Sequence, residues 1–135
     1  MTHMMAYFAL REDWHFQAAA VYGGMTDLGE YLETIDPEGK CASTVWADYA
    51  TRKNEILQPR SALRWPEKIL KPILIIHGGA DETVSPLHSL RIAEALTKLK
   101  REYGLVVFQG DNHIISRHRH ERDNLAMDWF RRHGG

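Results

Sequence analysis

The sequence predicts an α/β protein, built as a small parallel sheet of about three strands flanked by helices. Three short apolar runs support this prediction because they are nearly continuous rather than alternating: Ala18–Tyr22, Ile73–His77 and Leu105–Gln109. Strands covered on both faces have this pattern, which is typical of a parallel sheet between two layers of helices. Helical patterns separate the runs, and this alternation implies right-handed crossover connections. The 135 residues suit one domain, residues 1–135.

Before the first strand, a helix is expected after Thr2, which can cap its N-terminus. Four apolar residues follow at helical spacing: Met4, Met5, Phe8 and Ala9. Between the first and second strands, we expect a helix over Ser43–Ile56 and then a loop through Pro59 and Pro66. These elements lead the chain to the start of the second strand.

The second strand is followed by a helix that is expected to begin at Pro86 and to end at Gly104, because proline favours the first turn and glycine the end of a helix. Its apolar positions keep a helical rhythm: Leu90, Ile92, Ala93, Leu96 and Leu99. A final helix is expected to run into Gly134 and Gly135. It also has apolar residues at helical spacing: Leu125, Ala126, Trp129 and Phe130. The sequence therefore predicts a helix after each of the last two strands.

Composition and charge argue against several classes of function. The net charge of −1 argues against a nucleic-acid partner, because phosphate binding needs a surplus of Lys and Arg on one face. The apolar run Met1–Leu10 has no basic leader and is followed directly by three charged residues, so we expect neither a signal peptide nor a membrane span. Cys41 is the one cysteine, and its helical setting before Ala42 predicts a small packed residue rather than a nucleophile. We therefore expect a cytoplasmic protein with no nucleic-acid or membrane partner.

An acidic and a basic side chain follow the second and third predicted strands. Asp81 in HGGADETVSP and His113 in QGDNH each lie four residues past the end of a strand. The carboxyl ends of neighbouring parallel strands meet at one rim, where catalytic groups gather in such sheets. An aspartate that accepts from the Nδ1–H of a histidine fixes its tautomer, so that Nε2 can act as a base. We therefore predict that Asp81 and His113 form a catalytic pair, rather than a turn cap and a surface residue.

These two segments resemble a known family. The run ILKPILIIHGGADETVSPLHSLRIAEAL, followed by VVFQGDNHIISRHRHERDNLAMDWF, closely resembles the C-terminal part of α/β-hydrolases of the prolyl oligopeptidase and dienelactone hydrolase type. The upstream piece HMMAYFALREDWHFQAAAVYGGMTDL resembles the helix after the nucleophile elbow, the next strand and its turn. The resemblance implies a partial α/β-hydrolase fold in one truncated domain. It also implies that Asp81, in H-G-x-x-D-x-x-V-x-P, is the triad acid and that His113 is the triad base.

The third member of such a triad, a serine in a G-x-S-x-G elbow, is absent from the sequence. The resemblance places this serine just upstream of Met1, and Thr2 and His3 stand where relatives have glycines. Five serines remain, for which the resemblance predicts helix, loop or cap: Ser43, Ser61, Ser85, Ser89 and Ser116. Thr2 could act as a nucleophile only with a free α-amine, after removal of Met1. We therefore expect no activated serine in this chain.

No metal ion or cofactor is expected. His118 and His120 in SRHRHER are two residues apart, which places them on different faces of a helix, and no cysteine or paired carboxylate completes a tetrahedral set. The HGGADE turn lacks the Lys-Ser/Thr pair of a phosphate-binding loop. The two histidines are better explained as a solvated entry to the last helix.

Two classes of function remain. The first is a hydrolase of esterase or peptidase lineage with a small ester or peptide substrate, either as a shortened enzyme or as the C-terminal part of a longer one. The second is a non-catalytic remnant that associates with itself. The resemblance places the strand Ala18–Tyr22 beside the missing elbow strand, which would leave an open, apolar edge. We therefore expect a homo-oligomer joined through residues 4–22.

Overall fold

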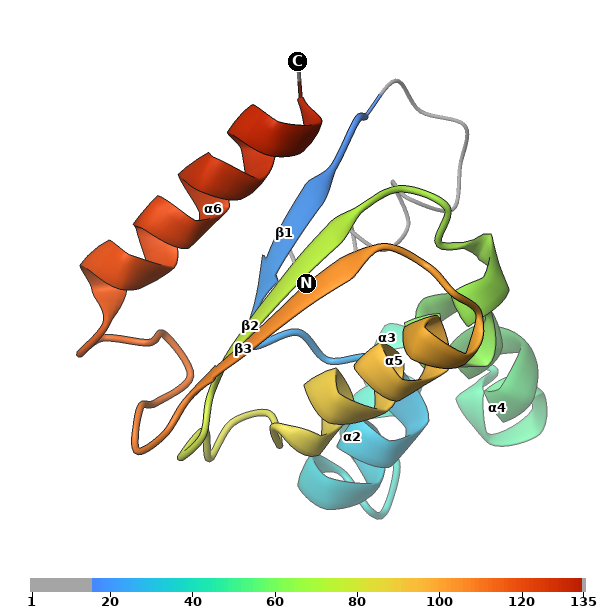
Figure 1. Cartoon of the computed structure of the whole chain (residues 1–135). Helices are drawn as coiled ribbons and strands as arrows, with labels where there is room; N and C mark the ends of the chain where they lie inside the picture. The colour runs from blue at the N-terminus through green and yellow to red at the C-terminus, as the bar shows by residue number, and fades with distance from the viewer. Residues whose placement is uncertain (1–15, 135) are drawn as a thin grey trace.

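The computed structural model of the chain describes residues 16–134. These residues form one sheet with helices on both of its faces (Figure 1). Three parallel strands lie in the order β1-β2-β3: β1 (Ala19–Tyr22), β2 (Ile73–Gly78) and β3 (Tyr103–Phe108). The predicted α/β fold with a small parallel sheet is thus confirmed, while the helix expected over residues 4–9 lies outside the described residues.

The helices divide between the two faces of the sheet. In Figure 1, α6 lies on one face, and the helices from α2 to α5 lie on the other. The bounds are α2 (Leu28–Ile35), α3 (Lys40–Val45), α4 (Tyr49–Leu57), α5 (Leu87–Lys98) and α6 (Arg119–His133). Helices connect β1 to β2 and β2 to β3, as the crossovers of a parallel sheet require, and α6 follows β3.

The apolar runs are continuous because the sheet is buried on both sides. In β2, Ile73 and Ile75 pack with α5 residues such as Ile92, while Leu74 and Ile76 pack toward α6 with Trp129. The side chains of a strand alternate between the two faces of a sheet. A strand with two covered faces therefore needs apolar residues at every position, which is why periodicity of two is missing from the sequence.

The segment between β1 and β2 differs from its prediction. The expected helix Ser43–Ile56 is two helices, α3 and α4, because Trp46 has extended backbone angles (φ −127°, ψ 103°) and ends α3. Its ring stacks on Tyr49, with 6.2 Å between the ring centroids, and Tyr49 is buried. The loop predicted through Pro59 and Pro66 consists largely of three short 3₁₀ turns.

The prediction that Gly104 ends the helix after β2 is wrong. Helix α5 ends at Lys98, and Gly104 lies inside β3. Lys100 takes the left-handed conformation that ends the helix, with φ 55°, and the Arg101 N–H bonds to the Leu96 carbonyl. Gly104 instead leaves room for neighbouring side chains, since a Cβ there would lie 3.0 Å from Leu74 Cδ1 and 3.3 Å from the Trp129 ring.

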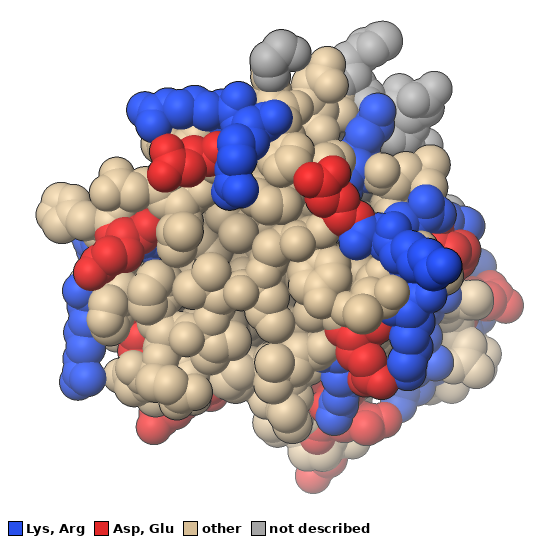
Figure 2. Space-filling model, in the orientation of Figure 1, with Lys and Arg blue, Asp and Glu red and all other residues tan. Residues whose placement is uncertain are grey.

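Strand β3 forms an edge of the sheet among the described residues, and the surface over it is uncharged. Every residue of β3 is half-buried. Figure 2 shows a broad area without Lys, Arg, Asp or Glu in the centre of the face that Figure 1 presents, with charges of both signs around it.

Within residues 16–134, the helices are too short or too polar to cross a membrane.

Candidate active site

The ends of the three strands bring the predicted residues to one rim of the sheet. Gly23 follows β1, Asp81 lies in the turn after β2, and His113 lies in the loop after β3. The Gly23 N–H donates to the Ile76 carbonyl at 2.9 Å, which holds the end of β1 against β2. The parallel strands therefore deliver the two side chains to the place where catalytic groups of α/β sheets gather.

Asp81 and His113 are in direct contact. The Asp81 Oδ2 atom lies 2.8 Å from His113 Nδ1, and the aspartate side chain is fully buried, while that of the histidine is 29% exposed. The other carboxylate oxygen, Oδ1, accepts from the backbone N–H groups of Thr83 and Val84, each at 2.9 Å. Burial acts to raise the pKa of Asp81, but the hydrogen bonds from Val84, His113 and Thr83 outweigh it and lower that pKa. An ionised Asp81 requires the Nδ1–H tautomer of His113 or its protonated form.

Asp111 anchors the loop that carries His113. Its carboxylate accepts from His118 Nδ1 at 2.9 Å and from the backbone N–H groups of Asn112, Arg117 and His118 at 2.9 to 3.3 Å. Burial opposes the charge, yet these bonds prevail and lower the pKa of Asp111 to about 2. His118 also stacks on Phe108, with 4.6 Å between ring centroids. The loop is therefore tied at both ends to the last residues of β3 and the start of α6.

Two glycines let the backbone approach His113 closely. A Cβ on Gly78 would lie 2.2 Å from the Asn112 carbonyl oxygen, so only glycine allows the His113 loop to cross the end of β2. A Cβ on Gly23 would lie 2.9 Å from His113 Nδ1, and Gly23 has φ +55°. The position of the imidazole is thus set by backbone packing as well as by its bond to Asp81.

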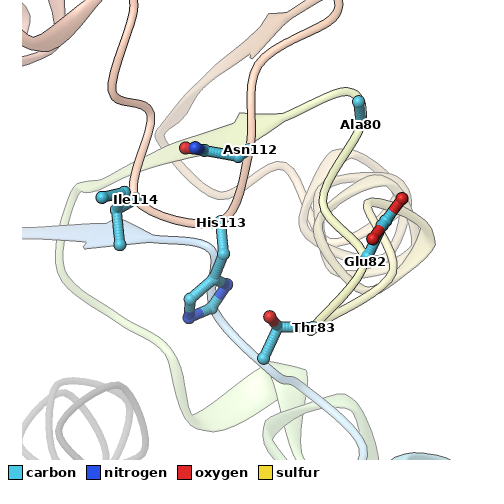
Figure 3. A pocket seen from close by; sticks show the side chains of 6 residues that line it. All are labelled: Ala80, Glu82, Thr83, Asn112, His113 and Ile114. Carbon is cyan, nitrogen blue, oxygen red and sulfur yellow. The ribbon is translucent and has the colours of Figure 1, made fainter.

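A shallow hollow opens beside His113. Six residues line it: Ala80, Glu82, Thr83, Asn112, His113 and Ile114. In Figure 3, the Thr83 side chain lies across from the His113 ring, and the Glu82 side chain points away from it. Ile114 lies on the same loop as His113. Ile114 is 57% exposed. A small molecule in this hollow would meet both the imidazole and an apolar side chain.

The predicted alternatives to a catalytic serine have structural partners. The five serine hydroxyls hydrogen-bond nearby groups: Ser43 to Gly39 O, Ser61 to Leu57 O, Ser85 with Leu87 N, Ser89 with His77 and Ser116 with Asn112. Thr2 lies outside the described residues.

Cys41 is exposed, so the prediction of a packed residue is wrong. On α3, the helix turns Ala42 rather than Cys41 toward the core.

The two histidines at the start of α6 have different surroundings. His118 lies at the N-terminal boundary of the helix and is bound to Asp111, while His120 is exposed on the first turn. No group of three or more metal-ligating side chains occurs in the part of the chain that the structure describes. His118 therefore helps to hold the loop that carries His113, whereas His120 faces the solvent.

Comparison with known proteins places this chain in a family. The model of the prolyl oligopeptidase family of serine peptidases matches residues 3–135. The chain belongs to the prolyl oligopeptidase family. It is 32% identical over 84 residues to the uncharacterized peptidase YuxL of Bacillus subtilis, an alignment that covers 58% of this chain and 13% of YuxL.

Solved structures of peptidases share the fold. The puromycin-hydrolyzing peptidase of Mycobacterium tuberculosis matches 96% of this chain and 20% of its own length, with a TM-score of 0.76 and 24% identity. The acylaminoacyl peptidase of Pyrococcus horikoshii matches 97% of this chain and 22% of its own length, with a TM-score of 0.72 and 23% identity. The described residues thus form a partial α/β-hydrolase fold. The chain spans between 13% and 22% of the length of these relatives.

Sequence reasoning missed four residues that shape the site. Gly23 and Gly78 carried a signal, since each directly follows or ends a predicted strand, where a tight backbone approach favours glycine. Asp111 stands inside the QGDNH motif and could have been read as a loop anchor. His77 ends the apolar run of β2 and carried no signal beyond its position. Its partners are Asp81 and Val84, which lie in the segment after β2, and Ser89, which lies in α5.

Proposed function

We propose that Asp81 and His113 are the acid and base of a serine-hydrolase site that cleaves a small ester or peptide. The supporting observation is the 2.8 Å contact between Asp81 Oδ2 and His113 Nδ1, with the aspartate buried at the rim of the sheet. The aspartate orients the imidazole and stabilises its charged form, and Nε2 transfers protons. Family membership supports the same assignment.

The reaction needs a hydroxyl that the described serines do not offer. In the proposed cycle, His113 Nε2 takes the proton of this hydroxyl as the oxygen attacks the substrate carbonyl carbon. The imidazolium then protonates the departing alcohol or amine, and the same base later activates the water that releases the acyl group. The hydroxyl would come from another segment of a longer hydrolase or from Thr2 of a second copy of this chain.

Hydrolysis of p-nitrophenyl acetate tests this proposal. The activity of the chain is compared with that of His113→Ala and of His120→Ala, which removes an exposed imidazole from α6. Loss of a positioned base costs about 10²- to 10⁴-fold in rate. After the rate in buffer is subtracted, the hydrolysis rate of His113→Ala should be lower than that of the parent by this factor, and the rate of His120→Ala should be unchanged. Equal rates in all three proteins, each above the rate in buffer, would show that His113 is not the base.

A serine-directed phosphonate probe examines the nucleophile separately. We expect no adduct on any serine of this chain, because the five hydroxyls bond to nearby partners. An adduct mapped by mass spectrometry to Ser61 or Ser85 would contradict this expectation. It would also identify the nucleophile directly.

A second candidate function is non-catalytic self-association through residues 4–22. Among the described residues, β1 pairs only with β2. Ala19 N bonds to Pro72 O and Gly23 N bonds to Ile76 O, so the odd-numbered residues point their backbone groups at β2. The N–H and C=O of Ala20 then point to the open edge, where another strand could add. This supports an interface that includes β1.

Sedimentation at micromolar concentration tests the interface. Proline at position 20 removes the outward N–H without removing a bond to β2, so Ala20→Pro should shift an oligomer to monomer. Ala20→Ser keeps the N–H and should keep the assembly. A monomeric parent chain would contradict self-association, and an oligomer unaffected by Ala20→Pro would place the interface elsewhere.

We further propose a cytoplasmic location. Cys41 is free and exposed, and an exposed free thiol suits a reducing compartment. Cell fractionation with a thiol-reactive label gives the test, since reduced Cys41 in the cytoplasmic fraction is the expected result. Recovery of the protein from the medium with Cys41 oxidised would contradict this location.

A further inference from the structure

His77 is a buried titratable residue that the proposed acid–base chemistry does not use. It lies near the end of β2 with no exposed surface. Its Nδ1 atom is 2.6 Å from the Ser89 hydroxyl of α5, and its Nε2 atom is 3.0 Å from the Val84 carbonyl oxygen. The same Nε2 atom is 3.0 Å from Asp81 Oδ2, the oxygen that binds His113. One imidazole thus joins α5 to the turn that carries the acid.

The surroundings of Nε2 determine its protonation. Two oxygens, Val84 O and Asp81 Oδ2, stand at 3.0 Å, and neither the carbonyl nor an ionised carboxylate has a proton to donate. Nε2 must therefore carry the hydrogen, since a bare nitrogen would set its lone pair against both. In the neutral ring Nδ1 is then an acceptor, and the Ser89 hydroxyl is the group that donates to it.

We propose that His77 is the positioning residue of Asp81, held in its Nε2–H form by Ser89, and that it keeps Oδ2 aimed at His113. This inference rests on the proposed roles of Asp81 and His113. Val84 closes the arrangement because its N–H donates to Asp81 Oδ1 while its carbonyl accepts from His77. Both carboxylate oxygens then have partners on the β2 side, and rotation of the carboxylate would break at least one of these contacts.

Two amides of His77 separate positioning from packing. The amide nitrogen of Gln reaches the place of Nε2, whereas that of Asn reaches only the place of Nδ1. His77→Gln therefore keeps a donor to the Val84 carbonyl and beside Asp81 Oδ2, while His77→Asn keeps a group beside Ser89 alone. The two variants are similarly polar and differ in where the donor lies.

The tautomer of His113 is the measured quantity, read from imidazole ¹⁵N and ¹H resonances of the full chain. His113→Gln assigns the signals. In the parent chain and in His77→Gln, we expect the Nδ1–H form with a downfield proton that exchanges slowly with water. In His77→Asn we expect loss of that proton signal and a mixture of tautomers, with the folded spectrum otherwise retained. None of these readings needs hydrolytic activity, so they remain informative if the proposed function fails.

Ser89→Ala provides a second path to the same answer should His77→Asn not fold. It removes one buried hydroxyl and leaves the His77 ring, and we expect a weakened His113 Nδ1–H signal in a folded protein. The proposal is overturned if folded His77→Asn retains the parent His113 signal, or if Ser89→Ala retains it where His77→Asn is unfolded. Failure of His77→Gln to preserve the signal in a folded protein would likewise assign His77 a packing role only.

Discussion

Gly78 lies directly beneath the carbonyl group of Asn112, where a Cβ would come within 2.2 Å of the oxygen. The end of β2 and the loop that carries His113 are therefore in backbone contact. A neighbouring contact continues this arrangement, since the Ala80 N–H donates to the Asp111 carbonyl at 2.9 Å. The position of His113 is therefore determined by contacts with β2 and with the turn that carries Asp81.

Replacing Gly78 by alanine should displace the loop and destabilise the protein. Overpacking of a tight site costs about 1–3 kcal/mol, and here the obstacle is backbone, which cannot move aside as a side chain can. Urea denaturation measures the loss. Gly110→Asn is the control in the same loop, because Gly110 has φ +72° that Asn tolerates and a Cβ there would meet only Arg117 Nη1 at 3.7 Å. Equal stabilities of the two variants would show that the loop adapts freely.

Gly23→Ala should disturb the imidazole itself. A left-handed backbone angle costs a non-glycine residue about 1–2 kcal/mol, and the added methyl would also press on His113 Nδ1 at 2.9 Å. Gly39→Ala carries the same backbone cost at φ +69° but meets Tyr49 instead. Both variants should lose stability, whereas only Gly23→Ala should alter the His113 ring resonances. An unchanged ring signal in folded Gly23→Ala would contradict the contact.

Asp81→Asn tests the electrostatic part of the proposed site. An amide in place of the carboxylate cannot hold the Nδ1–H tautomer and stabilise an imidazolium, and in a serine-protease triad the equivalent change costs about 10⁴-fold in kcat. We expect a loss of this order in any hydrolysis that depends on His113. The measurement is kcat/KM for a p-nitrophenyl ester. Activity within a few-fold of the parent would remove Asp81 from the mechanism.

Asp111 should make stability depend on pH in the acid range. Its pKa is about 2 in the folded protein against an ordinary value of 3.8, so the folded state binds the proton less readily than the unfolded state. Its contribution is therefore complete above about pH 4 and is lost as the pH falls toward 2. Asp111→Asn should lower the urea midpoint at pH 5 and converge with the parent near pH 2. A constant difference between the two proteins across this range would contradict the assignment.

The strands and the location of the site could be predicted because both follow from local patterns. Continuous apolar runs report burial on two faces, and the carboxyl ends of parallel strands meet whatever lies between them in sequence. The contacts of His77 could not be predicted, because Ser89 and Val84 approach it only after α5 packs on the sheet. The break at Trp46 could not be predicted either, because Tyr49, on which the Trp46 ring stacks, packs with the distant residues Leu28 and Leu32 of α2.

The end of α5 shows a different limit. A glycine within reach of a helical pattern suggests a stop signal, but Gly104 serves the packing of Trp129, and the left-handed position is filled by Lys100. Helix α5 ends with a left-handed residue as many helices do, but this residue is a lysine and not the usual glycine. Such a mismatch cannot be recognised without the backbone angles.

The left-handed backbone conformation of Lys100 suggests a stabilising substitution. Lys100 has φ 55° at the end of α5, and its side chain is exposed. Glycine at this position avoids a cost of about 1–2 kcal/mol in the folded state and loses part of that gain to greater freedom of the unfolded chain. Lys100→Gly should therefore raise the free energy of unfolding by up to about 1 kcal/mol in urea titrations.

Lys98→Gly is the matched control for this prediction. It replaces the same residue type two positions earlier, where the backbone is still helical and the Lys98 ammonium lies 2.6 Å from Glu94. Glycine in a helix costs about 1 kcal/mol relative to a good helix former, and the exposed ion pair adds little, so this variant should be destabilised. The two lysine-to-glycine changes are thus expected to have opposite signs. A loss of stability in both would mean that Lys100 does not hold its left-handed conformation at a cost.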